Sequence, residues 1–255
     1  MDLNRLRFRI CTGARVWPGC LLTEGAGQGG APMSSYGQFC PVAKAMELLD
    51  ERWTLLVVRE LLAGSVRFND LRRGNPKMSP ALLAKRLRTL ERAGVVRRTV
   101  DDGRSRYTLT PCGEELRGIV NGLGAWSVRW IAQLGDEDLD PHLLMWDIRR
   151  TISIAAWPRG RTVVAFEFND VAPRAARWWL CVAGDDADVC DYDPGFDVTA
   201  TVATSLRTLI EIWRGDRSWS QALKGDLLTV TGPKSVCSQV PTWLGQMGLA
   251  AIDRP

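Results

Sequence analysis

The spacing of apolar residues divides the chain into a helical first part and a strand-rich last part. Residues 39–64, "FCPVAKAMELLDERWTLLVVRELLAG", predict two helices, because Pro41 suits a first turn and Gly64 suits a helix end. Residues 66–74, "VRFNDLRRG", predict a short strand and a brief helix that Asn69 caps. From Leu139 onward apolar and polar residues alternate instead, which is typical of strands.

Residues 75–94 carry clear signals for the start and the end of a helix. "NPKMSPALLAKRLRTLERAG" places Ser79 as N-cap and Pro80 at the first helical position, and the helix stops at Gly94. One face of this helix is apolar and holds Leu83, Leu87 and Leu90. The opposite face holds Ala81, Lys85, Arg88 and Arg92, with Arg86 at its flank. Such a helix packs on its leucines and presents its positive charges outward.

A hairpin and a long helix complete the first part. In "VVRRTVDDGRSRYTLT", residues 95–110, alternating residues flank an Asp-Gly turn, which predicts two antiparallel strands with Arg104 and Arg106 near the tip. Residues 111–134, "PCGEELRGIVNGLGAWSVRWIAQL", predict an amphipathic helix. Its apolar side holds Leu116, Ile119, Val120, Leu123, Trp126 and Trp130. A small domain needs less apolar surface than this for its own core, so we expect a second copy of the chain to cover part of it.

Charge separates the same parts of the chain. Of the 255 residues, 45% are hydrophobic and 24% are charged, as in a folded globular protein. Residues 34–135 hold 17 Lys and Arg against 10 Asp and Glu, whereas residues 136–255 hold 12 against 17. The acidic segment "LGDEDLDPH", residues 134–142, marks the boundary. We therefore expect a disordered N-terminal extension over residues 1–33, a basic domain over 34–135 and a second domain over 139–251.

The predicted order of elements in the basic domain is that of a winged helix-turn-helix, a mainly α fold. Its second motif helix enters the major groove of DNA, and its wing contacts the neighbouring backbone. A cationic helix face alone is more often merely solvated. Here a capped cationic helix, a basic hairpin and a local charge surplus occur together, which favours double-stranded DNA as the partner. The expected contacts are Ser79, Ala81, Lys85 and Arg88 in the groove, Arg86 and Arg92 at phosphates, and Arg104 and Arg106 in the wing.

Several stretches of this domain match one pattern in order. They are Cys40-Pro41-Val42, "RWTLLVVRELL" at 52–62, "RFNDLRR" at 67–73, "LAKRLRTLERAGVV" at 83–96 and "YTLTPCG" at 107–113. With these motifs the domain resembles the HxlR-type regulators, a branch of the MarR-like winged-helix proteins. The resemblance covers about 100 residues continuously. It implies a homodimer that joins through its terminal helices and binds a pseudo-palindromic operator.

Cys40 has two interpretations. The resemblance implies a sensor of oxidants or electrophiles, because some HxlR-like proteins use a cysteine at this Cys-Pro-Val position, and a helix N-terminus lowers the pKa of a thiol. The other interpretation is a small, half-buried packing residue near the dimer interface. The negative charges of Glu47, Asp50 and Glu51 favour packing, since they disfavour a thiolate.

The second domain is predicted to be α+β. Its expected strands have one-sided apolar faces, which hold Val164, Phe166 and Phe168, then Trp178, Leu180 and Val182, then Val198, Ala200 and Val202. A helix follows, with Leu206, Leu209, Ile210 and Trp213 on one face, and "LLTVTGP", residues 227–233, adds a strand. An antiparallel sheet covered by a few helices is the economical fold for this series.

A second resemblance concerns this domain. The strand series is followed by "TLIEIWRGDRSWSQALKGDLLTVTGP", residues 208–233, and by "WLG" at 243–245. In this layout the domain resembles the sterol carrier protein type 2-like domains, which implies an apolar cavity for a hydrophobic small-molecule effector. Candidate lining residues are Phe166, Phe168, Trp178, Leu209 and Trp213. The alternative is ordinary core packing. Aromatic residues at strand or helix spacing belong to a packed core more often than to a ligand cavity.

The motifs of enzymes and cofactor sites are missing from the sequence. His142 is the only histidine, and no P-loop or G-x-S-x-G motif occurs. The seven cysteines form no C-x-x-C pair, and the acidic "GDDADVCDYDPG", residues 184–195, lacks the spacing of a calcium-binding loop. We expect no enzyme activity, no cofactor and no metal. No apolar run reaches the roughly 20 residues of a membrane span, and no secretory signal is recognisable, so a cytoplasmic location is expected.

These observations favour a homodimeric, DNA-binding regulator of transcription. Control is expected from a hydrophobic effector in the second domain or from oxidation of Cys40. The alternative is a carrier of lipids or other small molecules whose basic half only binds another protein. Lys85, Arg88 and the arginines of the wing favour the regulator, because they have no evident use in a carrier.

Overall fold

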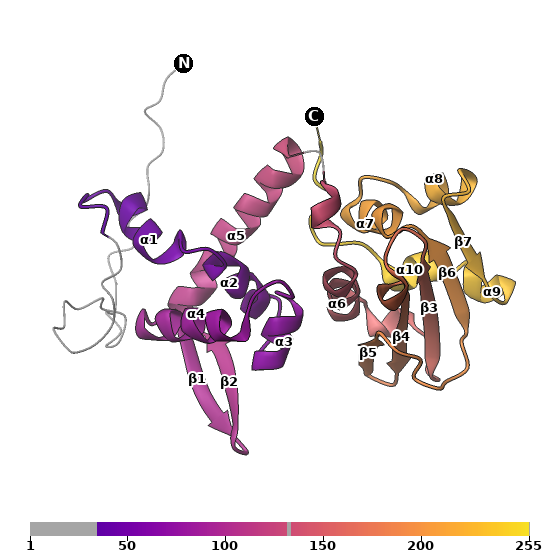
Figure 1. The fold of residues 1–255 in the computed structure, drawn as a ribbon, viewed down its shortest axis with the longest axis horizontal. Coiled ribbons are helices and arrows are strands. Elements are labelled where there is room, and N and C mark those ends of the chain that lie inside the picture. The colour runs from indigo at the N-terminus through magenta and orange to yellow at the C-terminus, as the bar shows by residue number, and fades with distance from the viewer. Residues whose placement is uncertain (1–34, 132–133, 255) are drawn as a thin grey trace.

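Two hydrophobic cores, one in each half of the chain, organise the molecule. The structure is a computed structural model that describes residues 35–131 and 134–254. One core is built from buried residues between Val57 and Val96, and the other from buried residues between Leu144 and Leu244. The two domains around these cores lie side by side (Figure 1). The extension predicted over residues 1–33 lies outside the described residues.

The first domain is a winged helix-turn-helix. Its elements are α1 (Pro41–Leu49), α2 (Thr54–Leu62), α3 (Phe68–Arg73), α4 (Pro80–Arg92), β1 (Val96–Asp101), β2 (Arg104–Leu109) and α5 (Pro111–Trp130). The two predicted first helices, the capped cationic helix, the hairpin and the long final helix are confirmed. No helix in the described parts of the chain is long and apolar enough to cross a membrane.

Two local predictions in this domain are wrong. Arg67, in an extended backbone conformation, occupies the N-cap position of α3, so Asn69 lies inside the helix and does not cap it. The expected short strand is reduced to a single bridge between Arg67 and Arg106. The backbone N–H of Tyr107 also donates to the carbonyl of Val66, at 2.8 Å. These contacts tie the hairpin to the segment that leads into α3.

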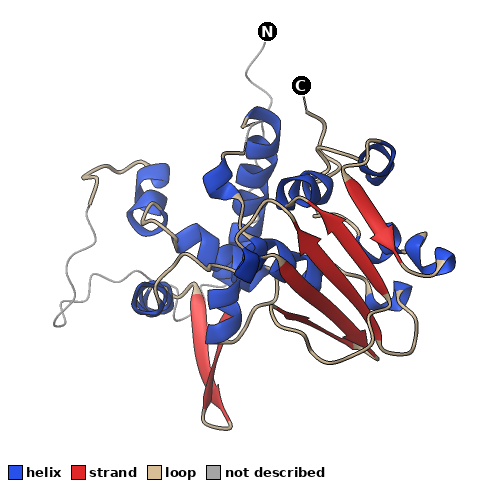
Figure 2. Cartoon of the chain, turned by 45° about the vertical axis from the view of Figure 1, so that its right-hand side comes forward, coloured by secondary structure: helices blue, strands red, loops and turns tan. Residues whose placement is uncertain are grey.

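The second domain combines a five-stranded sheet with several helices (Figure 2). Its strands are β3 (Thr162–Phe168), β4 (Arg177–Ala183), β5 (Asp186–Cys190), β6 (Ala200–Thr204) and β7 (Leu228–Thr231). Its helices are α6 (Pro141–Thr151), α7 (Leu206–Arg214), α8 (Trp219–Lys224), α9 (Lys234–Cys237) and α10 (Val240–Leu244), with short 3-10 turns η1 (Asp136–Asp138), η2 (Ile154–Ala156) and η3 (Pro173–Ala175). Inward residues of β3 and β4 pack against α6, α7 and α10 in one core.

The sheet is mixed, which corrects the prediction of an antiparallel sheet. Its order is β5-β4-β3-β6-β7, and β3 pairs with β6 in parallel, whereas the other neighbours are antiparallel. The connection from β3 to β6 runs through β4, β5 and residues 191–199, so it exceeds the dozen residues that a parallel pair requires. Val198, predicted on a strand face, is exposed in this crossover, and β6 begins at Ala200.

Helix α6 occupies a region where strands were expected. The side chain of Asp140 caps it by accepting from the backbone N–H groups of His142 and Leu143, at 3.0 and 3.2 Å. Pro141 stands at the first helical position, where its missing N–H costs nothing. The buried residues Leu144 and Ile148, four positions apart, point into the second core. α6 therefore belongs to the second domain, and its capping residue was present in the acidic boundary segment.

Candidate nucleic-acid interface

The cationic face of α4 is exposed. Ser79, Ala81, Lys85, Arg88 and Arg92 are accessible, while Leu83, Leu87 and Leu90 on the other face are buried in the first core. Among the residues that the structure describes, the side chains of Lys85, Arg88 and Arg92 have neither a hydrogen bond nor an ion pair. Unpaired cations on a helix of this kind can meet phosphates and guanine edges in the major groove.

One side-chain hydrogen bond caps α4, and two contacts of Arg86 fix the position of the helix. The hydroxyl of Ser79 accepts a hydrogen bond from the backbone N–H of Leu82, at 3.3 Å, so the predicted N-cap is confirmed. Arg86 is buried, with 6% of its surface exposed; its Nε donates to the carbonyl of Arg52 at 3.0 Å, and its guanidinium pairs with Glu51. The expectation that Arg86 contacts DNA phosphates is therefore corrected: Arg86 faces inward and joins α4 to the connection between α1 and α2.

The hairpin presents more arginines next to α4. It extends away from the body of the domain (Figure 1), and its turn residues Asp102 and Gly103 have φ values of 48° and 71°. These left-handed values suit the two-residue turn that the Asp-Gly pair predicted. Arg104 and Arg106 are exposed as expected. Arg97 on β1 is exposed as well; the "RR" pair at 97–98 was the signal for it in the sequence.

Helix α5 divides its apolar residues between the domain core and the surface. Leu116 and Val120 pack against the first core. By contrast Ile119, Leu123, Trp126 and Trp130 are 48%, 50%, 56% and 63% exposed. We call these four residues the α5 apolar face. A face of this size on a single chain is typical of a surface that another molecule covers.

Cys40 occupies the N-cap position of α1. Its side chain is half-buried, and its carbonyl accepts a hydrogen bond from the backbone N–H of Lys44, at 3.0 Å. Pro41 follows at the first helical position. Phe39, the residue before Cys40, is fully exposed. The thiol thus lies at a helix N-terminus beside an exposed aromatic side chain.

The five residues proposed to line an apolar cavity all lie in the second core. Phe166, Phe168, Trp178, Leu209 and Trp213 are each at most 5% exposed and pack in one cluster. Phe168 also lines a surface cavity of about 420 Å³ at the ends of β3, β4, β6 and β7. Trp178 lines a different cavity, which lies between the two domains.

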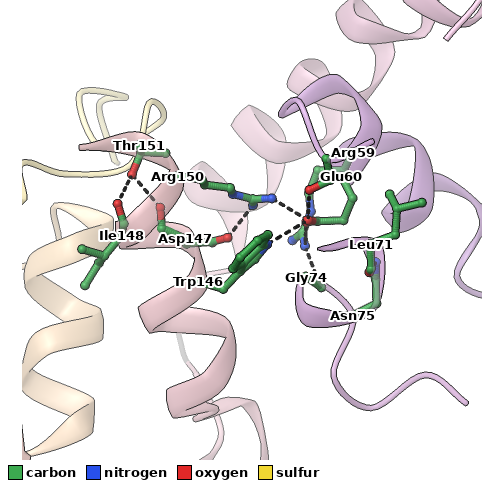
Figure 3. A network of polar contacts seen from close by, with 11 residues as sticks. Arg59, Glu60, Leu71, Gly74, Asn75, Trp146, Asp147, Ile148, Arg150 and Thr151 are labelled. Atoms are coloured by element: carbon green, nitrogen blue, oxygen red, sulfur yellow. Dashed lines mark hydrogen bonds and ion pairs between the residues drawn. The ribbon is translucent and has the colours of Figure 1, made fainter. Parts of the chain in front are cut away.

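A buried carboxylate joins the two domains. Glu60 of α2 is 0% exposed, and four donors reach its oxygens (Figure 3). Arg59 and Ser65 donate from the first domain, at 2.6 and 3.3 Å. Arg150 and the indole Nε1 of Trp146 donate from α6, at 2.6 and 3.3 Å. Because an unpaired buried carboxylate is costly, Glu60 needs α6 in this position. We call these five residues the Glu60 junction.

Other residues extend this contact on both sides. Arg150 also pairs with Asp147, and burial raises the pKa of this carboxyl although Arg150 acts in the opposite direction. The guanidinium groups of Arg73 and Arg149 lie 5.4 and 5.1 Å from the ring of Trp146. These contacts hold α6 beside α3, the helix that precedes α4 in the DNA-binding motif.

The cationic helix and the arginine-bearing hairpin define the first domain as a winged helix-turn-helix of the DNA-binding type. The model of the family described as HxlR-like helix-turn-helix matches residues 48–134. The chain is 38% identical over 98 residues to an uncharacterized HTH-type transcriptional regulator of Bacillus subtilis, YvaP, which is 37% of this chain and 91% of that protein. The chain belongs to the HxlR-like helix-turn-helix family.

Further similarities concern the same part of the chain. An uncharacterized HTH-type transcriptional regulator of Synechocystis, sll1512, is 31% identical over 122 residues, 47% of this chain and 88% of that protein. Among solved structures, quinone-bound YodB from Bacillus subtilis is 34% identical and has a TM-score of 0.32, over 35% of this chain and 97% of that chain. The segment that matches the family model ends at residue 134, before α6.

Proposed function

We propose that this protein is a transcriptional regulator that binds double-stranded DNA through α4 and the hairpin. The observation that carries the proposal is the set of solvated cations on a capped, well-packed helix: Lys85, Arg88 and Arg92. Ser79 and Ala81 lie at the start of the same helix, where they can approach base edges. Arg104 and Arg106 supply the wing contacts to the backbone. Relatives named as transcriptional regulators support this function.

The regulator acts as a homodimer in this proposal. The α5 apolar face supplies a self-complementary surface, and a two-fold dimer places its cationic helices about 34 Å apart, one turn of DNA. Such a dimer binds a pseudo-palindromic operator. Phe39, next to Cys40, is a further exposed apolar side chain of the first domain.

The second domain and Cys40 provide control in this proposal. A small-molecule effector that contacts the second domain alters DNA binding only if it favours one arrangement of the molecule over another. Cys40 is half-buried at the first turn of α1, so its oxidation would alter the start of the DNA-binding domain.

Selection of DNA followed by footprinting tests the proposed function. The full chain would be mixed with a random duplex library, and bound sequences would be enriched and then cleaved with hydroxyl radicals in the complex. The proposal predicts an inverted repeat whose two protected half-sites lie about 10 base pairs apart, on one side of the duplex. A single protected half-site would overturn the dimer, and the absence of any enriched sequence would overturn the function.

A further inference from the structure

A cavity of about 590 Å³ lies between α3 of the first domain and the second domain. Arg72 and Arg73 line it from α3. Trp146 of α6 and Trp178 of β4 line it from the opposite side, with His142 and Asp191. Its volume falls in the range of small-molecule sites, which measure roughly 300 to 1,000 Å³. Because its walls come from two domains, the cavity exists only in arrangements that keep α3 near α6.

The chemistry of the walls differs between the two sides. The second domain offers aromatic side chains: only the edges of Trp146 and Trp178 reach the cavity, since they are 3% and 4% exposed, and the exposed ring of His142 meets Trp178 edge-on, with 4.7 Å between centroids. The first domain offers positive charge. Arg72 and Arg73 are exposed, and no carboxylate of the described residues lies within ion-pair distance of either guanidinium.

From these walls we infer that the cavity is a binding site for a small aromatic carboxylate, which acts as the effector of the regulator. A planar ring can contact the imidazole of His142 and the accessible edges of the two indoles, and a carboxylate can accept two parallel N–H bonds from one guanidinium. Arg73 is already next to the aromatic wall, 5.4 Å from the ring of Trp146. Asp191, the acidic residue of the lining, repels negative charge, so the carboxylate of the ligand is expected on the side of the arginines, and ligands with further negative charges are disfavoured.

The inference rests on the proposed function for its consequence, since an effector needs a regulator. Trp146 connects the cavity to the fold, because the same indole that lines the cavity donates to Glu60 of α2. Lys77, between α3 and α4, donates to the carbonyl of Glu137 at 2.5 Å. A ligand that contacts Arg73 on one wall and the aromatic residues on the other therefore favours the arrangement in which α3 and the start of α4 are held against the second domain.

Calorimetric titration of the full chain, without DNA, tests the site itself. The probes are benzoate, 2-naphthoate and indole-3-acetate. The uncharged 2-naphthalenemethanol and the non-aromatic cyclohexanecarboxylate serve as controls. We expect at least one aromatic carboxylate to bind with one molecule per chain, and both controls to bind at least tenfold more weakly, because each lacks one half of the recognition.

Three variants locate the binding. Arg73→Gln removes one charge and should weaken binding about tenfold or more, the usual effect of losing a charged hydrogen bond. Asn69→Trp fills the cavity from its exposed rim and should abolish binding while both arginines remain. Arg159→Gln, an exposed arginine outside the cavity lining, should leave binding unchanged.

The outcomes separate the site from the regulator. If the three aromatic acids fail to bind at millimolar concentration, or bind Arg73→Gln and Asn69→Trp as well as the original chain, the inference is overturned. If Arg73→Gln weakens DNA binding but not binding of the acids, Arg73 contacts the DNA phosphates, and the inference is overturned as well. A chain that binds the acid but selects no DNA sequence retains the site and refutes the proposed regulator. For a working effector, the acid should shift operator affinity severalfold, and Asn69→Trp should remove that shift.

Discussion

The carboxylate of Glu60 on α2 accepts a 2.6 Å hydrogen bond from Arg150 on α6, and this ion pair is buried between the two domains. Glu60 is fully buried, and the side chain of Arg150 is 11% exposed. Both charges of this buried pair have lost their hydration. Removing one partner would therefore leave the other as an unpaired buried charge, which destabilises the fold. The pair therefore couples the position of the second domain to the DNA-binding domain. It is a constraint on orientation more than a source of net stability.

Arg150→Met should destabilise the protein strongly. The substitution keeps much of the side-chain volume and leaves Glu60 buried with fewer donors, which costs about 3 to 5 kcal/mol in comparable cases. The free energy of unfolding in urea measures the effect. The matched control is Arg177→Met, since Arg177 and Glu167 form an exposed pair across β3 and β4 at 4.0 Å. That change should cost less than about 1 kcal/mol, and equal losses in both variants would contradict the account of the Glu60 junction.

Gly74→Ala should disturb the same junction by steric conflict alone. A Cβ atom at Gly74 would lie 1.8 Å from Oε2 of Glu60, and the four donors prevent that carboxylate from moving aside freely. We expect a loss of about 1 to 3 kcal/mol, as for overpacking elsewhere. Urea unfolding again gives the number. Gly160→Ala, where a Cβ atom meets nothing within 4 Å, should be nearly neutral; a neutral Gly74→Ala would show that Glu60 is held less firmly than described.

Leu123→Glu should convert the proposed dimer into a monomer. Leu123 is 50% exposed on the α5 apolar face, so a charge there harms little in one chain but is buried when two faces meet. Sedimentation equilibrium would report the mass of two chains for the original protein and of one chain for the variant. Leu227→Glu, at a residue 42% exposed in the second domain, should leave the dimer intact. If the original protein already sediments as a monomer, the α5 apolar face is not a dimer surface.

Any response of the protein to oxidants should depend on Cys40 and not on Cys181 or Cys190, the cysteines of the sheet. Burial, together with Cys190 and Asp188, raises the pKa of the Cys181 thiol from 9.0 to about 11. Burial and the charge of Asp188 raise the pKa of Cys190 too. Because only the thiolate reacts, and a pKa of about 11 leaves roughly 0.1% thiolate at pH 8, native Cys181 should be alkylated about a hundredfold more slowly than an ordinary thiol.

Mass-spectrometric mapping after brief treatment with iodoacetamide at pH 8 checks the rates. Cys40→Ser supplies the functional test, since it should preserve operator binding while abolishing the effect of oxidant. If the oxidant response persists in Cys40→Ser, Cys40 is a packing residue and not the sensor. Rapid modification of Cys181 in the folded protein would contradict the raised pKa.

Local signals predicted the first domain well. Ser79 and Pro80 start α4, and the Asp102-Gly103 pair turns the hairpin, because capping and turn geometry depend on a few adjacent residues. The inward position of Arg86 was not predictable in this way. On a helical projection it lies at the flank of the cationic face, and its acceptor, the carbonyl of Arg52, is 34 residues away in the sequence.

Tertiary contacts account for the rest of what the sequence did not reveal. Glu60 looks like one more charge on an amphipathic helix, and its partner Arg150 lies 90 residues later. The parallel pairing of β3 with β6 depends on a crossover without regular structure, which no periodicity marks. The cavity beside Trp146 depends on how two domains meet, so alternation along one strand could not indicate it.

Fluorescence anisotropy of a selected operator duplex and of a scrambled duplex, at several salt concentrations, tests the central claim most directly. The account predicts tighter binding to the operator and a steep decrease of affinity with salt. Lys85→Ala combined with Arg88→Ala should cost several kcal/mol, at about 1 to 3 each if both read bases, and each residue that instead contacts a phosphate should reduce the salt slope by about one. Arg86→Ala should destabilise the fold and leave the salt slope nearly unchanged. Equal affinity for the two duplexes, or an operator affinity indifferent to the loss of Lys85 and Arg88, would contradict the assignment of α4 as the helix that reads DNA.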